Sequence, residues 1–356
     1  MFFNQSKFKK VSSLTTASLL VGGLLMGLVG FAQAQDPASY YDRGTVRIVV
    51  GFNPGGGYDE YARMIAAELE NRIGANVIVE NQPGGGGLLA LNRLVQAGDD
   101  RTMMLAGMES AALAQLTDRP GTRFDLSTLT MLGRAVEDTR VAMWSATRPE
   151  RTFAEVLNTM NTSGSRWGAT GLTDSVSDTT AAMGEALKLN RDQLSIVMGY
   201  GGTSDIALAV VRGEVDGVVV SSSSAINYAG DNSMVPLATL SRERDPLFPD
   251  TPTIFEVGNL DAEGERWMDF RANITTLGRA LVMRGGIDPA RAEFLANKIE
   301  EVLTDADFLA NASATNRPID FLPANDLNRL IADIFADLSD ARKAEVQTVL
   351  NEKFIR

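Results

Sequence analysis

Two glycine-rich segments of the sequence combine residue types that could bind an anion: residues 53–59, NPGGGYD, and residues 81–87, NQPGGGG. Each follows a run of β-branched residues and precedes a stretch with the apolar spacing of a helix. Glycines permit positive φ and leave backbone N–H groups uncovered, and a helix start adds unpaired donors and a partial positive charge. Two such corners at successive strand–helix junctions predict an oxyanion site, built mainly from backbone, at one edge of an open sheet.

The anion that these segments favour is a carboxylate. Neither segment has the Lys-Ser or Lys-Thr of a phosphate-binding P-loop, and neither matches the dinucleotide-binding fingerprint. Asp59, at the end of the first segment, would repel a doubly charged phosphate more strongly than a carboxylate. The alternative is that the glycines only make tight turns, with Asp59 as the N-cap of the following helix.

The residues needed for most hydrolytic chemistry are missing. The 356-residue sequence has no histidine and no cysteine, which excludes Ser-His-Asp and Cys-His catalysis, disulfides, and imidazole or thiolate metal sites. The four serines at 221–224 would need a lysine partner to supply a nucleophile, so we interpret them as a polar loop or a helix cap. Asp99, Asp100 and Asp216 lack the spacing of a calcium loop. We therefore expect no metal and no cofactor.

Composition and charge narrow the class of partner. The chain is 44% hydrophobic and 22% charged, which is ordinary for a globular protein and, at this length, provides for two domains. A formal net charge of -12 argues against nucleic acid or an anionic membrane as a partner. Trp144 and Trp167 are expected in the core rather than against a ligand.

The first 34 residues have the pattern of a secretory signal peptide. Lys7, Lys9 and Lys10 precede an apolar stretch over residues 11–31, and residues 32–34 read Ala-Gln-Ala. We predict export to the periplasm with cleavage after Ala34. The alternative is an uncleaved signal anchor, because the apolar stretch is nearly long enough to span a bilayer.

Short apolar runs then alternate with helical patterns, which predicts an α/β protein with largely parallel sheets. The expected strands cover residues 46–50, 76–80, 101–106, 140–144, 167–170, 195–198, 215–220 and 234–240. The expected helices cover residues 59–73 and 88–96, a stretch opened by Thr152, and residues 289–303, 324–338 and 340–353. We expect the chain to cross between two domains, with residues 35–143 plus 240–356 in domain 1 and 144–239 in domain 2.

Residues 46–87 resemble the solute receptors of tripartite tricarboxylate transporters, the Bug-type periplasmic binding proteins. The Pro-Gly-Gly-x-x-Asp and following Ala-Arg of that family correspond to residues 54–59 and 62–63, and its Val-x-Asn-x-Pro-Gly-Ala-Gly-Gly corresponds to residues 79–87. Further landmarks match in order at residues 200–202, 213–216 and 249–256. Two departures stand out, because Tyr58 replaces a small Thr or Ser, and residues 168–175 match only loosely.

The resemblance implies a two-domain periplasmic binding protein of the Venus flytrap, type II-like class, with hinge crossovers and a cleft that closes on a small organic acid. It implies membrane carrier subunits as partners, a monomer, and no nucleic acid. The ligand-binding residues that it and the loop pattern suggest are Gly55, Gly56, Gly57, Tyr58, Asp59, Pro83, Gly84, Gly85, Gly86, Gly87, Thr170, Gly171, Ser175, Tyr200, Gly202, Thr203 and Asp205.

Two other function classes stay open at this point. An exported enzyme could act on a carboxylate substrate with Asp and Arg chemistry, and turnover of a bound acid would identify it. A sensory protein could present the ligand-closed form to a membrane kinase. Both would use the same fold, so the site must distinguish them.

Overall fold

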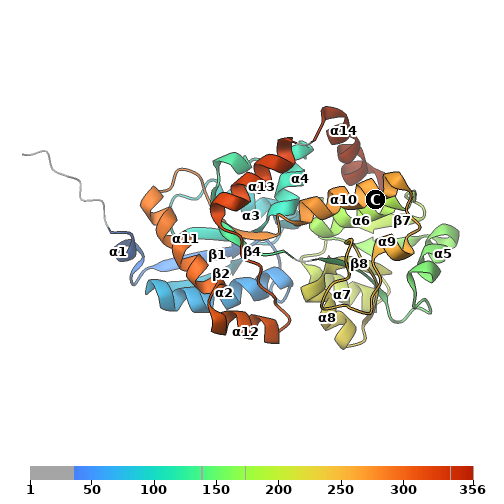
Figure 1. Cartoon of the computed structure of the whole chain (residues 1–356), viewed down its shortest axis with the longest axis horizontal. Coiled ribbons are helices and arrows are strands. Elements are labelled where there is room, and N and C mark those ends of the chain that lie inside the picture. Colours follow the sequence, from blue (N-terminus) through green and yellow to red (C-terminus); the bar gives the residue numbers. More distant parts are fainter. Residues whose placement is uncertain (1–35, 138, 173, 337, 356) are drawn as a thin grey trace, which may run out of the picture. The chain divides into compact units, whose positions relative to one another are not determined.

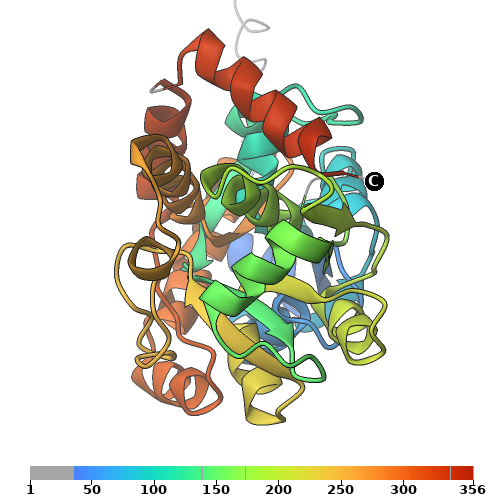
Figure 2. The same ribbon diagram turned by 90° about the vertical axis from the view of Figure 1, so that its right-hand side faces the viewer.

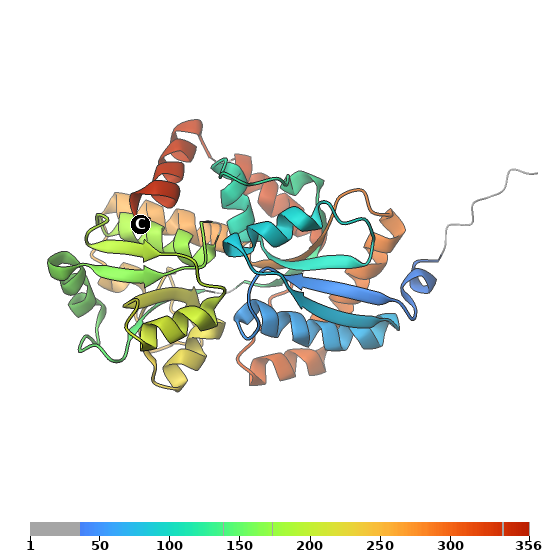
Figure 3. The same ribbon diagram turned by 180° about the vertical axis from the view of Figure 1, so that it is seen from behind.

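The computed structural model describes residues 36–137, 139–172, 174–336 and 338–355, and the expected signal peptide and its cleavage site lie outside them. Residues 37–356 form one compact unit. Among the described residues, no helix combines the length and the apolar character that crossing a bilayer would require. The strands of the unit divide into two sheets of five (Figures 1 and 3).

The first sheet has the strand order β2-β1-β3-β10-β4. Its strands are β1 (Thr45–Val50), β2 (Asn76–Asn81), β3 (Thr102–Gly107), β4 (Thr130–Val136) and β10 (Arg279–Met283). β1 pairs in parallel with β2 and β3, whereas β10 runs antiparallel to both β3 and β4.

The second sheet repeats this topology with the order β7-β6-β8-β5-β9. Its strands are β5 (Arg140–Ser145), β6 (Ser165–Gly168), β7 (Leu194–Val197), β8 (Gly217–Ser221) and β9 (Met234–Thr239). β6 is parallel to β7 and β8, and β5 is antiparallel to β8 and β9. In each sheet the antiparallel strand is the first one that the chain forms after leaving the other sheet. The predicted α/β two-domain class is confirmed.

We call each sheet with its packed helices a lobe. The helices of the first lobe are α1 (Pro37–Tyr41), α2 (Gly57–Ile73), α3 (Leu88–Leu94), α4 (Met108–Leu116), α11 (Pro289–Leu303), α12 (Ala306–Ala314) and α13 (Ala324–Ala336). Those of the second lobe are α5 (Phe153–Ser163), α6 (Ser175–Ala186), α7 (Thr203–Val211), α8 (Ser222–Gly230), α9 (Ile254–Val257), α10 (Ala262–Thr275) and α14 (Asp340–Thr348). Short 3-10 turns cover Gly85–Gly87 and Leu126–Thr128, and a π-helix covers Val349–Lys353.

The end of the chain returns to the second lobe, where the π-helix after α14 contacts α6 (Figure 2). The amide of Ile196 in β7 donates to the carbonyl of Phe354 at 2.9 Å. The sequence-based division assigns all of 240–356 to domain 1 and sets the first boundary at residue 144, which lies inside β5. The division of the chain into domains remains a prediction.

The buried residues of each element show why the sequence predicts some helices and strands and not others. α2 buries Ala62, Ile65, Ala66, Leu69 and Ile73 and ends at Gly74 with a φ of 66°, as its spacing predicted. Trp144 and Trp167 are fully buried with ring centroids 5.7 Å apart, which confirms their place in the core. Strands β4 and β10 were not predicted, because short buried runs have no periodicity that separates strand from helix.

Candidate functional site

The first glycine segment forms an uncapped helix start. α2 begins at Gly57, with Gly56 as its N-cap, and among the described residues no side chain caps it. The alternative interpretation of Asp59 as the N-cap is wrong, because Asp59 lies in the first helical turn. The first amides of a helix have no acceptor within the helix and lie at its positive end. This start can therefore bind an anion.

Asp59 instead fixes the loop. Its carboxylate accepts hydrogen bonds from the Gly55 amide at 3.0 Å, from Asn81 Nδ2 at 2.9 Å and from the Arg63 guanidinium at 2.9 Å. Burial acts to raise the pKa of Asp59, but the hydrogen bonds from Arg63, Gly55 and Asn81 outweigh burial and hold this pKa below its usual value. The charged Asp59 thus ties the first glycine segment to the start of the second.

The second glycine segment has a backbone that only glycine adopts readily. Gly84, Gly85, Gly86 and Gly87 have φ values of 145°, 60°, 70° and 92°. α3, which follows, is only seven residues long, shorter than the 88–96 that we predicted. A Cβ added to Gly51, just before the first segment, would lie 2.6 Å from Gly87 Cα, so the two segments pack closely.

Contacts between the lobes bring all four predicted segments together. The Asn53 amide donates to the Gly201 carbonyl at 2.8 Å, and Asn53 Nδ2 donates to Asp205 Oδ2 at 2.8 Å. A Cβ added to Gly171 would lie 2.9 Å from the carbonyl carbon of Gly85. The glycine segments of the first lobe therefore face the loops around residues 170–175 and 200–205 of the second.

A cavity whose lining includes the charged residues Arg140, Asp174 and Arg279 lies where these segments meet. The centre of a water molecule can reach about 30 Å³ of this cavity, so water has room to enter it. The predicted residues that line it are Gly56, Gly57, Tyr58, Thr170, Ser175 and Thr203. The lining residues that sequence reasoning missed are Phe52, Arg140, Asp174, Val176, Ser221, Ser224 and Arg279. We call this the polar cavity below.

Two buried arginines, one from each lobe, line the polar cavity. Arg279 begins β10, donates to Ser221 Oγ at 2.9 Å and lies 4.6 Å from the ring centre of Tyr58. Arg140 begins β5 and forms an ion pair with Glu109, and Arg140 Nε has no hydrogen-bond partner within the described part of the chain. Burial and the neighbouring Arg271 lower the pKa of Arg140 to about 9. A bound anion would favour the charged form of this group.

Asp174 supports its own loop at the other side of the polar cavity. It caps α6 and accepts hydrogen bonds from Thr170 Oγ1 at 2.7 Å and from the amides of Thr170 and Val176. Burial raises the pKa of Asp174, against these hydrogen bonds. Because its oxygens already accept three hydrogen bonds, the carboxylate positions the loop.

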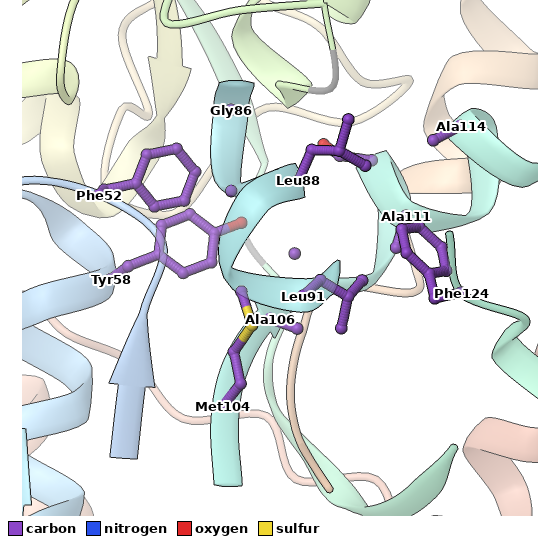
Figure 4. A pocket seen from close by; sticks show the side chains of 13 residues that line it. Phe52, Tyr58, Gly86, Leu88, Leu91, Met104, Ala106, Ala111, Ala114 and Phe124 are labelled. Atoms are coloured by element: carbon purple, nitrogen blue, oxygen red, sulfur yellow. The ribbon is translucent and has the colours of Figure 1, made fainter. Parts of the chain in front are cut away.

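A second, apolar cavity shares Phe52 and Tyr58 with the polar one (Figure 4). The centre of a water molecule can reach about 20 Å³ of this second cavity. It is lined by Phe52, Tyr58, Gly86, Gly87, Leu88, Leu91, Met104, Ala106, Gly107, Ser110, Ala111, Ala114 and Phe124. The stacked rings of Phe52 and Tyr58, 4.7 Å apart, lie at the side where the two cavities adjoin. We call this the apolar chamber.

The remaining predicted residues lie around the cavities without lining either: Gly55, Asp59, Pro83, Gly84, Gly85, Gly171, Tyr200, Gly202 and Asp205. Tyr200 is half-buried against the core of the second lobe, and Pro83 is exposed. Contact between any predicted residue and a ligand stays a prediction.

The missed residues left a partial signal in the sequence. Arg140 and Arg279 each open a short strand that is buried along its whole length, and a charge at such a position needs a partner. The serines at 221–224 are all buried, and Ser221 accepts from Arg279 rather than capping α8. Among the described residues, no cluster of side chains could hold a metal ion.

Comparison with known proteins finds Bug-type proteins similar to this chain in sequence and in structure. The chain is 24% identical over 294 residues to Protein BugT of Bordetella pertussis, a match that covers 81% of this chain and 85% of BugT. The solved structure of the periplasmic binding protein BugD has a TM-score of 0.71 at 18% identity, covering 89% of this chain and 100% of BugD. MatC from Rhodopseudomonas palustris, solved with bound malate, has a TM-score of 0.71 at 19% identity, and the match covers 86% of this chain and 99% of MatC.

A family match covers most of the chain and begins just after the first glycine segment. The family described as "Tripartite tricarboxylate transporter family receptor" matches residues 61–335, which run from α2 through both sheets to α13. This is most of the chain, and the resemblance to this family is thereby confirmed. The chain belongs to the tripartite tricarboxylate transporter receptor family, whose Bug-type members it resembles in fold.

Proposed function

We propose that this protein is an exported, periplasmic receptor that binds a small carboxylate between its lobes and delivers it to a membrane carrier of the tripartite tricarboxylate type. The observation that carries the proposal is the polar cavity at the uncapped start of α2, with a buried arginine from each lobe. Family membership and the malate bound to MatC support a carboxylate as the ligand.

The cavity's chemistry fits binding better than turnover. Backbone amides at Gly57 and Tyr58 and the two guanidinium groups offer donors to carboxylate oxygens, and such charge-assisted bonds contribute about 1.5–3 kcal/mol each. Asp174 is the one carboxylate among the described residues that line the cavity, and it already accepts hydrogen bonds from its own loop. We therefore propose a monomeric receptor without enzymatic activity, in place of an enzyme that uses Asp and Arg chemistry.

The experiment is a calorimetric titration of the purified protein with small organic acids, repeated on Gly57→Ala and Gly98→Ala. A Cβ at Gly57 would lie 2.9 Å from Ser224 Oγ and 3.0 Å from Arg279, inside the site. A Cβ at the exposed Gly98 meets no atom within 4 Å, so this variant is the matched control.

We expect at least one acid to bind, Gly57→Ala to weaken it tenfold or more, and Gly98→Ala to leave its affinity unchanged. The melting temperature of ligand-free Gly57→Ala should stay close to that of the parent, since the contacted atoms end flexible side chains. Equal affinity in both variants would show that the acid binds elsewhere. Chemical conversion of the bound acid would contradict the receptor role.

A further inference from the structure

Tyr58 lies between the polar cavity and the apolar chamber and lines both of them. It is the second residue of α2, so its side chain begins beside the uncapped amides that we assign to the carboxylate of the acid. Its half-buried ring and that of Phe52 lie at one side of the chamber (Figure 4). An acid bound at the start of α2 therefore meets the Tyr58 ring before it reaches the chamber.

Three neighbours from different elements hold the Tyr58 ring in place. It stacks on Phe52, which follows β1, with the ring centroids 4.7 Å apart and the ring planes at 28° to each other. The guanidinium carbon of Arg279, at the start of β10, lies 4.6 Å from the centre of the ring. The hydroxyl group lies against Gly107 at the end of β3. A ring held on three sides forms a wall between the two cavities.

Gly107 provides the space that the Tyr58 hydroxyl fills. Its φ is -79°, which any residue adopts, so the backbone conformation does not require glycine at this position. A Cβ added to Gly107 would collide with the Tyr58 hydroxyl. The missing side chain at Gly107 and the large side chain at Tyr58 are therefore complementary, and the ring is fitted to this position.

We infer that Tyr58 limits the length of the acid that the receptor binds, because its ring closes the polar cavity off from the apolar chamber. The inference rests on the proposed function and deepens it from small carboxylates in general to short ones. The chamber is the space that a longer acid would enter if the ring were absent. Tyr58 is thus a specificity-determining residue of the site.

The test is a calorimetric titration with straight-chain acids from acetate to octanoate and from malonate to suberate. It compares the parent protein with Tyr58→Ala and Tyr58→Phe. We define the length limit as the longest acid of a series that binds within tenfold of the best one. In Tyr58→Ala this limit should move up by at least two methylene groups, and each buried methylene should raise the affinity about fourfold. Tyr58→Phe keeps the ring and should keep the limit of the parent.

Two further variants show whether the added length enters the chamber. Ala111 lines the chamber, so Ala111→Leu in the Tyr58→Ala background should bring the limit back toward that of the parent. Tyr40→Ala is the matched control, because Tyr40 is also half-buried in the first lobe and has an arginine, Arg291, over its ring. Tyr40 lines neither cavity, and its removal should leave the limit unchanged.

A thermal unfolding cycle tests the fitted wall without any ligand. Gly107→Ala should lower the melting temperature of the parent by about 2 °C or more and should have little effect in the Tyr58→Ala background, where the collision is absent. Equal effects in both backgrounds, or an unchanged length limit in Tyr58→Ala, would overturn the inference while the receptor proposal stands. If no acid binds to the parent or to any variant, the receptor proposal fails and the inference fails with it.

Discussion

At the scale of single residues, the site depends on two arginines that lie at the first positions of strands. Arg140 and Arg279 open β5 and β10, the antiparallel strand of each sheet, so each lobe contributes one guanidinium to the polar cavity. Guanidinium groups match the planar geometry of a carboxylate and remain charged when buried. The net charge of -12 for the whole chain matters less, because exposed charges beyond about 8 Å are screened.

Asp59 provides a pH-dependent test of the loop. The pKa of Asp59 is lower in the folded protein than in the unfolded chain, so its stabilisation is fully present above the unfolded value of about 3.9. It is lost as pH falls through the lower folded value. Asp59→Asn should lower the free energy of unfolding at pH 7 by about 1–2 kcal/mol.

Urea unfolding at a series of pH values measures this effect. The difference between wild type and Asp59→Asn should be constant from pH 7 to about 5 and shrink below about pH 4. A difference that grows on acidification would mean that the carboxylate is not held in its charged form by Arg63, Gly55 and Asn81.

At the scale of elements, the sequence could indicate the two strand–loop–helix units but not all of their neighbours. β1, α2 and β2 follow from local periodicity and from Gly74 at the helix end, and the glycine segments mark where the strands stop. β10 inserts between β3 and β4 from far along the chain, and no local pattern specifies that pairing. Arg279 was missed for this reason, since its place in the site depends on the insertion.

The second glycine segment makes a measurable prediction about backbone conformation. Gly85 has a φ of 60°, and a Cβ there would meet only Leu88 Cβ at an ordinary 3.6 Å. Gly85→Ala should therefore lower the free energy of unfolding by about 1–2 kcal/mol through the left-handed conformation alone. Gly98→Ala, in open surroundings, should be neutral or slightly stabilising. Urea unfolding of both variants checks this, and equal stabilities would mean that the segment adopts another conformation in solution.

At the scale of the whole molecule, the lobes are in contact around a small cavity. The contacts between the lobes, such as those of Asn53 with Gly201 and Asp205, could not be predicted from the sequence. They depend on how the two lobes pack against each other, which no local sequence pattern specifies. The family resemblance indicated that such a cleft exists and which loops border it. It did not indicate that Tyr58 would divide the space in two.

Asn53 tests whether these contacts favour the closed arrangement. Asn53→Ala removes the hydrogen bond to Asp205 but keeps the backbone bond to Gly201. One such bond contributes about 1 kcal/mol, so the affinity for the acid should fall about fivefold. Asn71→Ala removes an exposed bond within α2 and should leave affinity unchanged. The same titration measures this affinity. An unaltered affinity in Asn53→Ala would show that ligand binding does not depend on the hydrogen bond between Asn53 and Asp205.

The most direct measurement of the central claim is a crystal structure of the protein with its tightest-binding acid. Our account predicts the carboxylate within hydrogen-bond distance of the first amides of α2 and of the Arg279 guanidinium, with the lobes closed over it. An acid bound in the open groove between α10 and α14, which is lined by Phe270 and Arg342, with the polar cavity unchanged, would contradict it.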